Sequence, residues 1–89
     1  MAESGKNFQV AILTPAQKVF SGEAVSLTAP GELGYLGIWA NHAPLLSTLK
    51  AGKITLRKQA GEELSFISPG AGFLEVFHNK VTLLLDAVV

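Results

Sequence analysis

The stretch of sequence that decides the fold is residues 29–49, which read APGELGYLGIWANHAPLLSTL. It contains three glycines spaced three residues apart, the chain's single tyrosine and single tryptophan, and one of its two histidines. Glycine lets the backbone adopt positive φ or approach another strand closely. The glycines therefore predict a series of tight turns. Aromatic side chains held in turns lie at a surface, so we expect this stretch to form a docking surface for other proteins.

On both sides of this stretch, apolar residues alternate with polar ones, which is the pattern of strands with one buried face. The alternating segments are residues 8–13, 18–20, 23–29, 53–58, 63–68, 71–77 and 80–85. Turns are expected between them at residues 14–17, 21–22, 59–62, 68–70 and 78–79. No window shows the apolar spacing of a helix over three turns. The sequence therefore predicts an all-β domain, an antiparallel β-sandwich of two sheets.

The predicted core consists of apolar residues that share one face of these strands. They are Phe8, Val10, Ile12, Val25, Leu27, Ile54, Leu56, Phe66, Leu83 and Leu85. Each is expected to contribute about 1.5–3 kcal/mol on burial. Leu84 points the opposite way, which predicts a final strand covered on both faces.

Length and composition limit the classes of function. A chain of 89 residues predicts a single domain, residues 1–89. It is 48% hydrophobic and only 16% charged, which predicts either a tightly packed core or apolar patches that bind partners. Seven basic and seven acidic residues, without a basic stripe, argue against nucleic acid. No apolar run approaches the roughly 18 residues of a membrane span, so no direct membrane insertion is expected.

No arrangement of residues predicts catalysis, a cofactor or a metal. The glycines follow the spacing GxxGxxG, which differs from the dinucleotide motif, and no helix pattern follows them. His42 and His78 match no compact metal-ligand spacing, and the chain has no cysteine. His42 is either a hydrogen-bonded structural residue or part of a partner surface. A free-standing β-sandwich binding module, for a carbohydrate or a peptide, stays open as an alternative function, as does a small enzyme.

Several motifs together resemble a known family. They are FSG at residues 20–22, GYLGI at residues 34–38, NHAPLL at residues 41–46, LEV at residues 74–76 and VTLL at residues 81–84. The chain resembles, over nearly its whole length, the N-terminal domain of the ε subunit of the F-type (rotary) ATP synthase, whose mitochondrial counterpart is the δ subunit. This resemblance implies a β-sandwich of about ten short strands.

The resemblance also implies a function. The domain would be a non-catalytic subunit of the central stalk that couples the γ subunit to the membrane c-ring during proton-driven ATP synthesis. It would be a peripheral membrane protein on the cytoplasmic face of a bacterial inner membrane, or of an equivalent energy-coupling membrane. The residues that the resemblance assigns to the partner interface are Gly34, Tyr35, Leu36, Trp39, Asn41, His42, Ala43 and Pro44.

Two features depart from the family pattern. Tyr35 stands where the family usually has an acidic residue facing the c-ring loops, and it replaces that charge with an amphipathic ring. The sequence stops at Val89, where most members continue into two C-terminal helices that inhibit ATP hydrolysis. We therefore expect those helices to be absent, in a form that is either naturally short or truncated.

Overall fold

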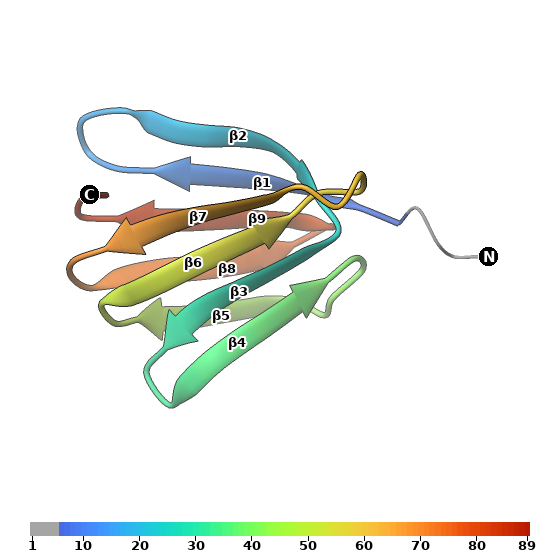
Figure 1. The fold of residues 1–89 in the computed structure, drawn as a ribbon. Coiled ribbons are helices and arrows are strands. Elements are labelled where there is room, and N and C mark those ends of the chain that lie inside the picture. The colour runs from blue at the N-terminus through green and yellow to red at the C-terminus, as the bar shows by residue number, and fades with distance from the viewer. Residues whose placement is uncertain (1–5) are drawn as a thin grey trace.

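The computed structural model describes residues 6–89, which form nine β-strands and no helix (Figure 1). The strands are β1 (Phe8–Leu13), β2 (Lys18–Ala24), β3 (Ser26–Gly31), β4 (Gly34–Trp39), β5 (Leu45–Leu49), β6 (Gly52–Arg57), β7 (Glu63–Ser68), β8 (Gly72–Phe77) and β9 (Lys80–Leu85). The all-β prediction is confirmed, with nine strands against the ten or so expected. Residues 1–5 of the predicted domain lie outside the described residues.

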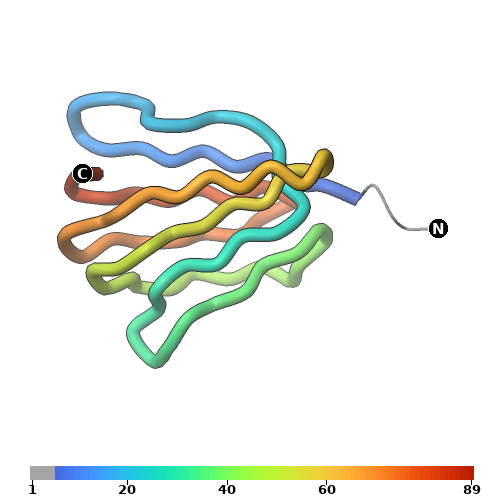
Figure 2. Tube along the Cα trace, in the orientation of Figure 1, coloured from blue at the N-terminus to red at the C-terminus, as the bar shows by residue number. Residues whose placement is uncertain are grey.

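The strands form two layers that face each other. One layer has the order β2-β1-β9-β8-β5, and the other consists of β4, β3, β6 and β7 (Figures 1 and 2). A single pair, Gly31 with Leu49, joins β3 to β5, so the two layers are one curled sheet. Every pairing is antiparallel except that of β1 with β9, which is parallel. The expectation of purely antiparallel pairing is therefore wrong at this one place.

Two of the predicted hairpin turns are confirmed. Residues 58–62 connect β6 to β7, with hydrogen bonds between Lys58 and Glu62 and between Gly61 and Lys58. His78 and Asn79 connect β8 to β9 and have φ values of 50° and 59°. Positive φ at both central residues matches the right-handed twist of the flanking strands.

Two predicted turns are wrong. Residues 34–39 are not a series of turns but strand β4, which pairs with β3 along its whole length after a turn at residues 32–33. Because the glycines interrupt the alternation of apolar and polar residues, the sequence pattern of this strand resembles that of a loop. Likewise, the turn predicted at residues 21–22 is the middle of β2, where Gly22 lies opposite Val10 of β1.

The core fills the space between the layers. Its buried apolar residues are Phe8, Val10, Ile12, Ala24, Leu27, Ala29, Ile38, Leu49, Ile54, Leu56, Leu74, Val76, Val81, Leu83 and Leu85. The sequence placed Val25 here wrongly, because the chain bends at that residue between β2 and β3 and Ala24 points inward instead. Phe66 is only half-buried and packs 5.9 Å from the ring of Phe20. Leu84 is 50% exposed, so the face of β9 that carries it is not fully covered.

Candidate protein-binding surface

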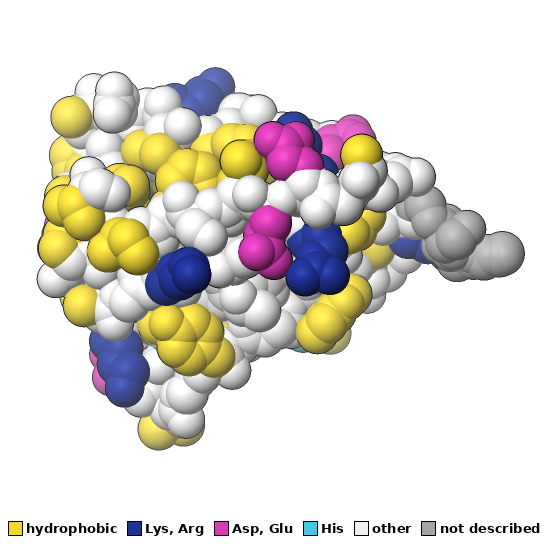
Figure 3. Space-filling model, in the orientation of Figure 1, with side chains coloured by type: hydrophobic (Ala, Val, Ile, Leu, Met, Phe, Trp, Pro, Cys, Tyr) yellow, Lys and Arg dark blue, Asp and Glu magenta, His cyan; other side chains and the backbone are white. Residues whose placement is uncertain are grey.

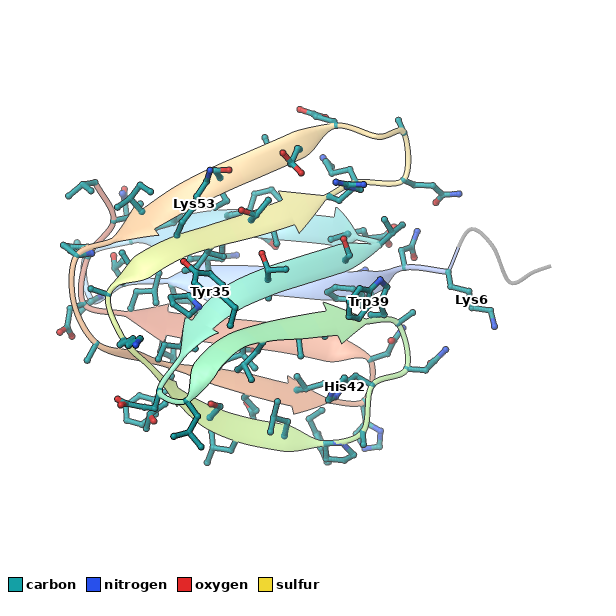
Figure 4. All side chains as sticks on the ribbon, turned by 60° about the horizontal axis from the view of Figure 1, so that its bottom comes forward. Lys6, Tyr35, Trp39, His42 and Lys53 are labelled. Carbon is teal, nitrogen blue, oxygen red and sulfur yellow. The ribbon has the colours of Figure 1, made fainter. Side chains whose placement is uncertain are left out.

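The eight predicted interface residues lie at the two ends of β4 and do not form one patch. Gly34, Tyr35 and Leu36 belong to the β3–β4 tip, which comprises residues 31–36. Trp39 and the His42 loop, residues 40–44, lie at the other end. A strand rises about 3.3 Å per residue, so the ends of β4 are roughly 16 Å apart. Figure 4 shows this separation, with Tyr35 toward one end and Trp39 with His42 toward the other.

Tyr35 is held by a hydrogen bond although its side chain is 61% exposed. Its hydroxyl accepts a hydrogen bond from the backbone N–H of Lys53 in β6, at 3.2 Å (Figure 4). The backbone pairing of β3 with β6 ends at Thr28 and Thr55, so the hydroxyl binds an amide beyond that pairing. Gly52 provides the room, because a Cβ there would lie 2.8 Å from Cβ of Pro30 and 3.2 Å from the hydroxyl oxygen. The Tyr35 side chain therefore reaches across β3 and connects the tip of β4 to β6.

Replacing Tyr35 with phenylalanine is expected to lower the free energy of unfolding by about 0.5–1.5 kcal/mol, because the Lys53 amide loses its partner. In a domain of this size that corresponds to a fall in Tm of roughly 4–8 °C per kcal/mol, measurable by thermal unfolding. The matched control is Lys53→Ala, which changes the other partner but keeps its backbone N–H. Equal Tm values for the phenylalanine variant and the parent would show that the hydroxyl contributes nothing.

The tip also presents apolar side chains that the sequence did not single out. Leu33 in the turn is fully exposed, and Leu46 on the neighbouring strand β5 is 74% exposed. Together with half-buried Leu36 they line a depression of about 470 Å³. Leucine in a two-residue turn was the signal available in the sequence, because turns favour glycine, asparagine and aspartate. Exposed apolar side chains that adjoin each other are typical of a partner site.

Trp39, at the other end of β4, lies on the same face as Tyr35 and is also 61% exposed. Its ring packs over Gly37, where a Cβ would lie only 2.7 Å from the ring atom Cζ3. Any larger residue at position 37 would displace the indole. Gly37 therefore lets the Trp39 ring pack against the strand. The rest of the ring stays exposed, as is typical of aromatic residues that anchor interfaces.

The His42 loop, which follows directly, contains a residue with positive φ and a local hydrogen bond. Asn41 has a φ of 63°, a left-handed conformation that asparagine tolerates better than most residues. The ring nitrogen Nδ1 of half-buried His42 lies 2.7 Å from the carbonyl oxygen of Ala43, and because a carbonyl can only accept, Nδ1 is the donor. His42 is thus hydrogen-bonded and also lines a surface depression, while its place in a partner surface stays a prediction.

That depression, of about 480 Å³, lies between the His42 loop and the β8–β9 turn. Its lining residues are Asn41, His42, Ala43, Pro44, Phe77, His78 and Asn79. The rings of Phe77 and His78 meet edge-on with centroids 4.1 Å apart. The sequence missed the β8–β9 side of this depression, because only the fold brings residues so distant along the chain together.

A third apolar feature crosses the outer face of the β2-β1-β9-β8-β5 layer. Leu13, Leu84 and Phe73 are neighbours in register on β1, β9 and β8 and border a groove of about 520 Å³. On the face drawn in Figure 3, apolar side chains are most numerous at one end, but charged side chains of both signs occur at both ends. An exposed ion pair joins Arg57 to Glu63 at 3.1 Å.

Across residues 6–89 no group of three or more histidine, aspartate or glutamate side chains is placed to hold a metal ion. Nor does that part of the chain contain a helix long and apolar enough to cross a membrane.

Comparisons with known proteins give a family by sequence and the same fold among solved structures. The family model for the ATP synthase Delta/Epsilon chain, beta-sandwich domain, matches residues 7–89. The ATP synthase epsilon chain of Chlorobium limicola is 47% identical over 88 residues, which are 99% of this chain and 99% of that protein. The epsilon chain of Dichelobacter nodosus is 47% identical over 79 residues, 89% of this chain but 54% of that protein. The chain thus spans about half the length of the second relative.

Solved structures show the same fold at low sequence identity. A chain of the Euglena gracilis mitochondrial ATP synthase, solved with OSCP, F1 and the c-ring, superposes with a TM-score of 0.84 at 15% identity. It covers 100% of this chain and 57% of that one. A chain of the Tetrahymena thermophila mitochondrial ATP synthase central stalk and c-ring gives 0.76 at 18% identity and covers 91% and 64%. The family model and the relatives at 47% identity show that the chain belongs to the ATP synthase delta/epsilon family and that residues 7–89 are its β-sandwich domain.

Proposed function

We propose that this domain couples two rotating bodies of an F-type ATP synthase, the γ subunit and the c-ring, and that it catalyses no reaction itself. The observation that carries the proposal is the presence of two exposed apolar sites at opposite ends of β4. The β3–β4 tip is one of them, and Trp39 with the His42 loop is the other. Two partners can bind at such a distance without competing for the same side chains.

The two ends are assigned to different partners. The family resemblance puts the position of Tyr35 against the loops of the c-ring, so we propose that the tip binds the ring. Because Tyr35 carries no charge, this contact would rest on Leu33, Leu46 and the tyrosine ring and not on an ion pair. The Trp39 end would then bind γ. Tryptophan and tyrosine are enriched among residues that dominate binding energy.

The core makes the domain suited to transmitting torque. Close-packed protein interiors have low compressibility, so a load applied at one end of β4 reaches the other end with little deformation. The core side chains of both layers, among them Ile38 on β4 itself, are essentially fully buried. In this role the domain would sit beside the membrane, on the cytoplasmic side of a bacterial inner membrane or an equivalent energy-coupling membrane.

Binding to purified γ and to a purified c-ring tests the proposal directly. We expect the chain to co-elute with γ in size-exclusion chromatography at low and at moderate salt, because apolar contacts are not screened by salt. With the c-ring we expect binding that Leu33→Asp weakens while leaving the γ complex intact. Failure to co-elute with γ at either salt concentration would contradict the proposal.

A carbohydrate- or peptide-binding module is the second candidate. It is favoured by one observation, the presence of Tyr35 and Trp39 on the same face of β4 with Gly37 between them. The chain contains a single tryptophan, so ligand binding at this face would change its fluorescence. Saturable quenching by an oligosaccharide, together with no affinity for γ, would favour this function over the coupling role.

A further inference from the structure

We propose that Asn79 is a positioning residue that holds the His42 loop in its binding conformation. The side chain of Asn79 lies where three segments distant in sequence meet. These segments are the β8–β9 turn, the His42 loop and the residues that lead into β1. The inference rests on the proposed role of the His42 loop, because it explains how that loop acquires a fixed shape.

Both ends of the Asn79 amide are used. The side-chain oxygen Oδ1 accepts a hydrogen bond from the backbone N–H of Asn41 at 2.6 Å. The nitrogen Nδ2 donates to the backbone carbonyl of Asn7 at 3.0 Å. A backbone N–H can only donate and a carbonyl can only accept, so these two partners fix the orientation of the amide.

The backbone of Asn79 adds a third connection. Its carbonyl accepts a hydrogen bond from the N–H of Gln9, in β1, at 3.2 Å. Its φ of 59° is in the left-handed region, and this conformation is part of the turn that lets the half-buried side chain reach the loop. Asn79 therefore meets two requirements that few residues combine, namely tolerance of positive φ and a side chain that both accepts and donates.

The Asn41 contact is the one that bears on binding. Asn41 also has positive φ and immediately precedes His42, so the direction of the chain at Asn41 decides where the His42 ring points. Without the bond to Asn79, the Asn41 amide would face solvent and the loop would be free to take other conformations. A loop that must order itself on binding has a lower affinity than one ordered in advance.

Two substitutions separate the effect of the Asn79 side-chain amide from the effect of the turn conformation. Asn79→Gly keeps the positive φ and the backbone bond to Gln9 but removes both side-chain bonds. Asn79→Asp keeps an acceptor for Asn41 and loses the donor to Asn7. The matched control is His78→Gly, which introduces glycine at the other positive-φ position of the same turn and leaves the Asn79 amide in place.

Hydrogen exchange of the Asn41 amide, followed by NMR on the free domain, tests the contact itself. We expect Asn79→Gly to reduce protection of this amide roughly 3- to 10-fold, as for loss of one neutral hydrogen bond. Asn79→Asp and His78→Gly should leave that protection within about 2-fold of the parent, because the acceptor remains. The amides of Val81 and Leu83 in the core of β9 should exchange alike in all variants. Unchanged protection of Asn41 in Asn79→Gly would overturn the inference.

Affinity for purified γ, measured by calorimetry well below the Tm of each variant, tests the consequence. We expect Asn79→Gly to weaken binding roughly 3- to 10-fold and Asn79→Asp to restore most of it. If Asn79→Gly frees the Asn41 amide but binds γ as tightly as the parent, Asn79 is only structural and the positioning role is wrong. If the parent itself does not bind γ, the coupling proposal fails, whereas the exchange experiment still decides whether Asn79 fixes the loop.

Discussion

Replacing Leu83 with alanine is expected to lower the free energy of unfolding by about 2–5 kcal/mol, the range for a fully buried leucine. Leu83 is fully buried on β9, where it lies between Ile12 of β1 and Leu74 of β8. A domain of 89 residues is stable by roughly 4–13 kcal/mol, so this one change removes a large share of its stability. Urea denaturation followed by circular dichroism gives the difference from the shift in midpoint at unchanged slope.

The next residue provides the control. Leu84 has the same side chain but faces outward and is 50% exposed, so Leu84→Ala should cost about 1 kcal/mol or less. The ratio of the two effects tests the face assignment of β9. Equal losses for both variants would mean that a partner or a rearrangement covers Leu84 in solution, and that the two faces of β9 are not distinct.

The second large effect concerns binding. Trp39→Ala is expected to weaken binding to γ by about 2 kcal/mol, or roughly 30-fold, because exposed tryptophans that dock into a partner dominate interface energies. Because the Trp39 ring packs on Gly37, the free domain already holds the ring in place. Binding therefore loses no affinity to ordering this side chain. Isothermal titration with purified γ measures the change.

An outward aromatic residue on the other layer serves as the control for Trp39. Phe73 on β8 is 51% exposed and belongs to a different surface, so Phe73→Ala should leave the affinity for γ within about 2-fold. If Phe73→Ala weakens binding more than Trp39→Ala, γ docks on the β2-β1-β9-β8-β5 layer and the assignment of the Trp39 end is wrong.

Strands with one buried face could be predicted from the sequence, and the reason is physical. In β6 the alternation of apolar and polar residues reports burial on one side, and nine of the ten predicted core residues either belong to the core or pack against it. The failures lie where glycine hides a strand. In β4 two glycines suppress the alternation: Gly34 has a φ of 136°, and Gly37 leaves room for the ring of Trp39, so neither contributes a side chain to the core.

The candidate site was predictable in part. The eight interface residues named from motifs stay a prediction. Their division between the two ends of β4 could not be predicted, because it follows from the strand that the glycines concealed. The hydrogen bond of Tyr35 to Lys53 and that of Asn79 to Asn41 connect residues 18 and 38 positions apart. Contacts at such separations depend on sheet topology, for which a local pattern carries no information.

The parallel pairing of β1 with β9 has a consequence for biosynthesis. Gln9 lies opposite Lys80, so β1 gains its inner neighbour only when β9, the last of the nine strands described, has been synthesised. Until then β1 and β2 form an isolated hairpin, which is marginal in water. The nascent domain should therefore complete its fold only after β9 has left the exit tunnel, and the early hairpin is the part that a chaperone would need to shield until then.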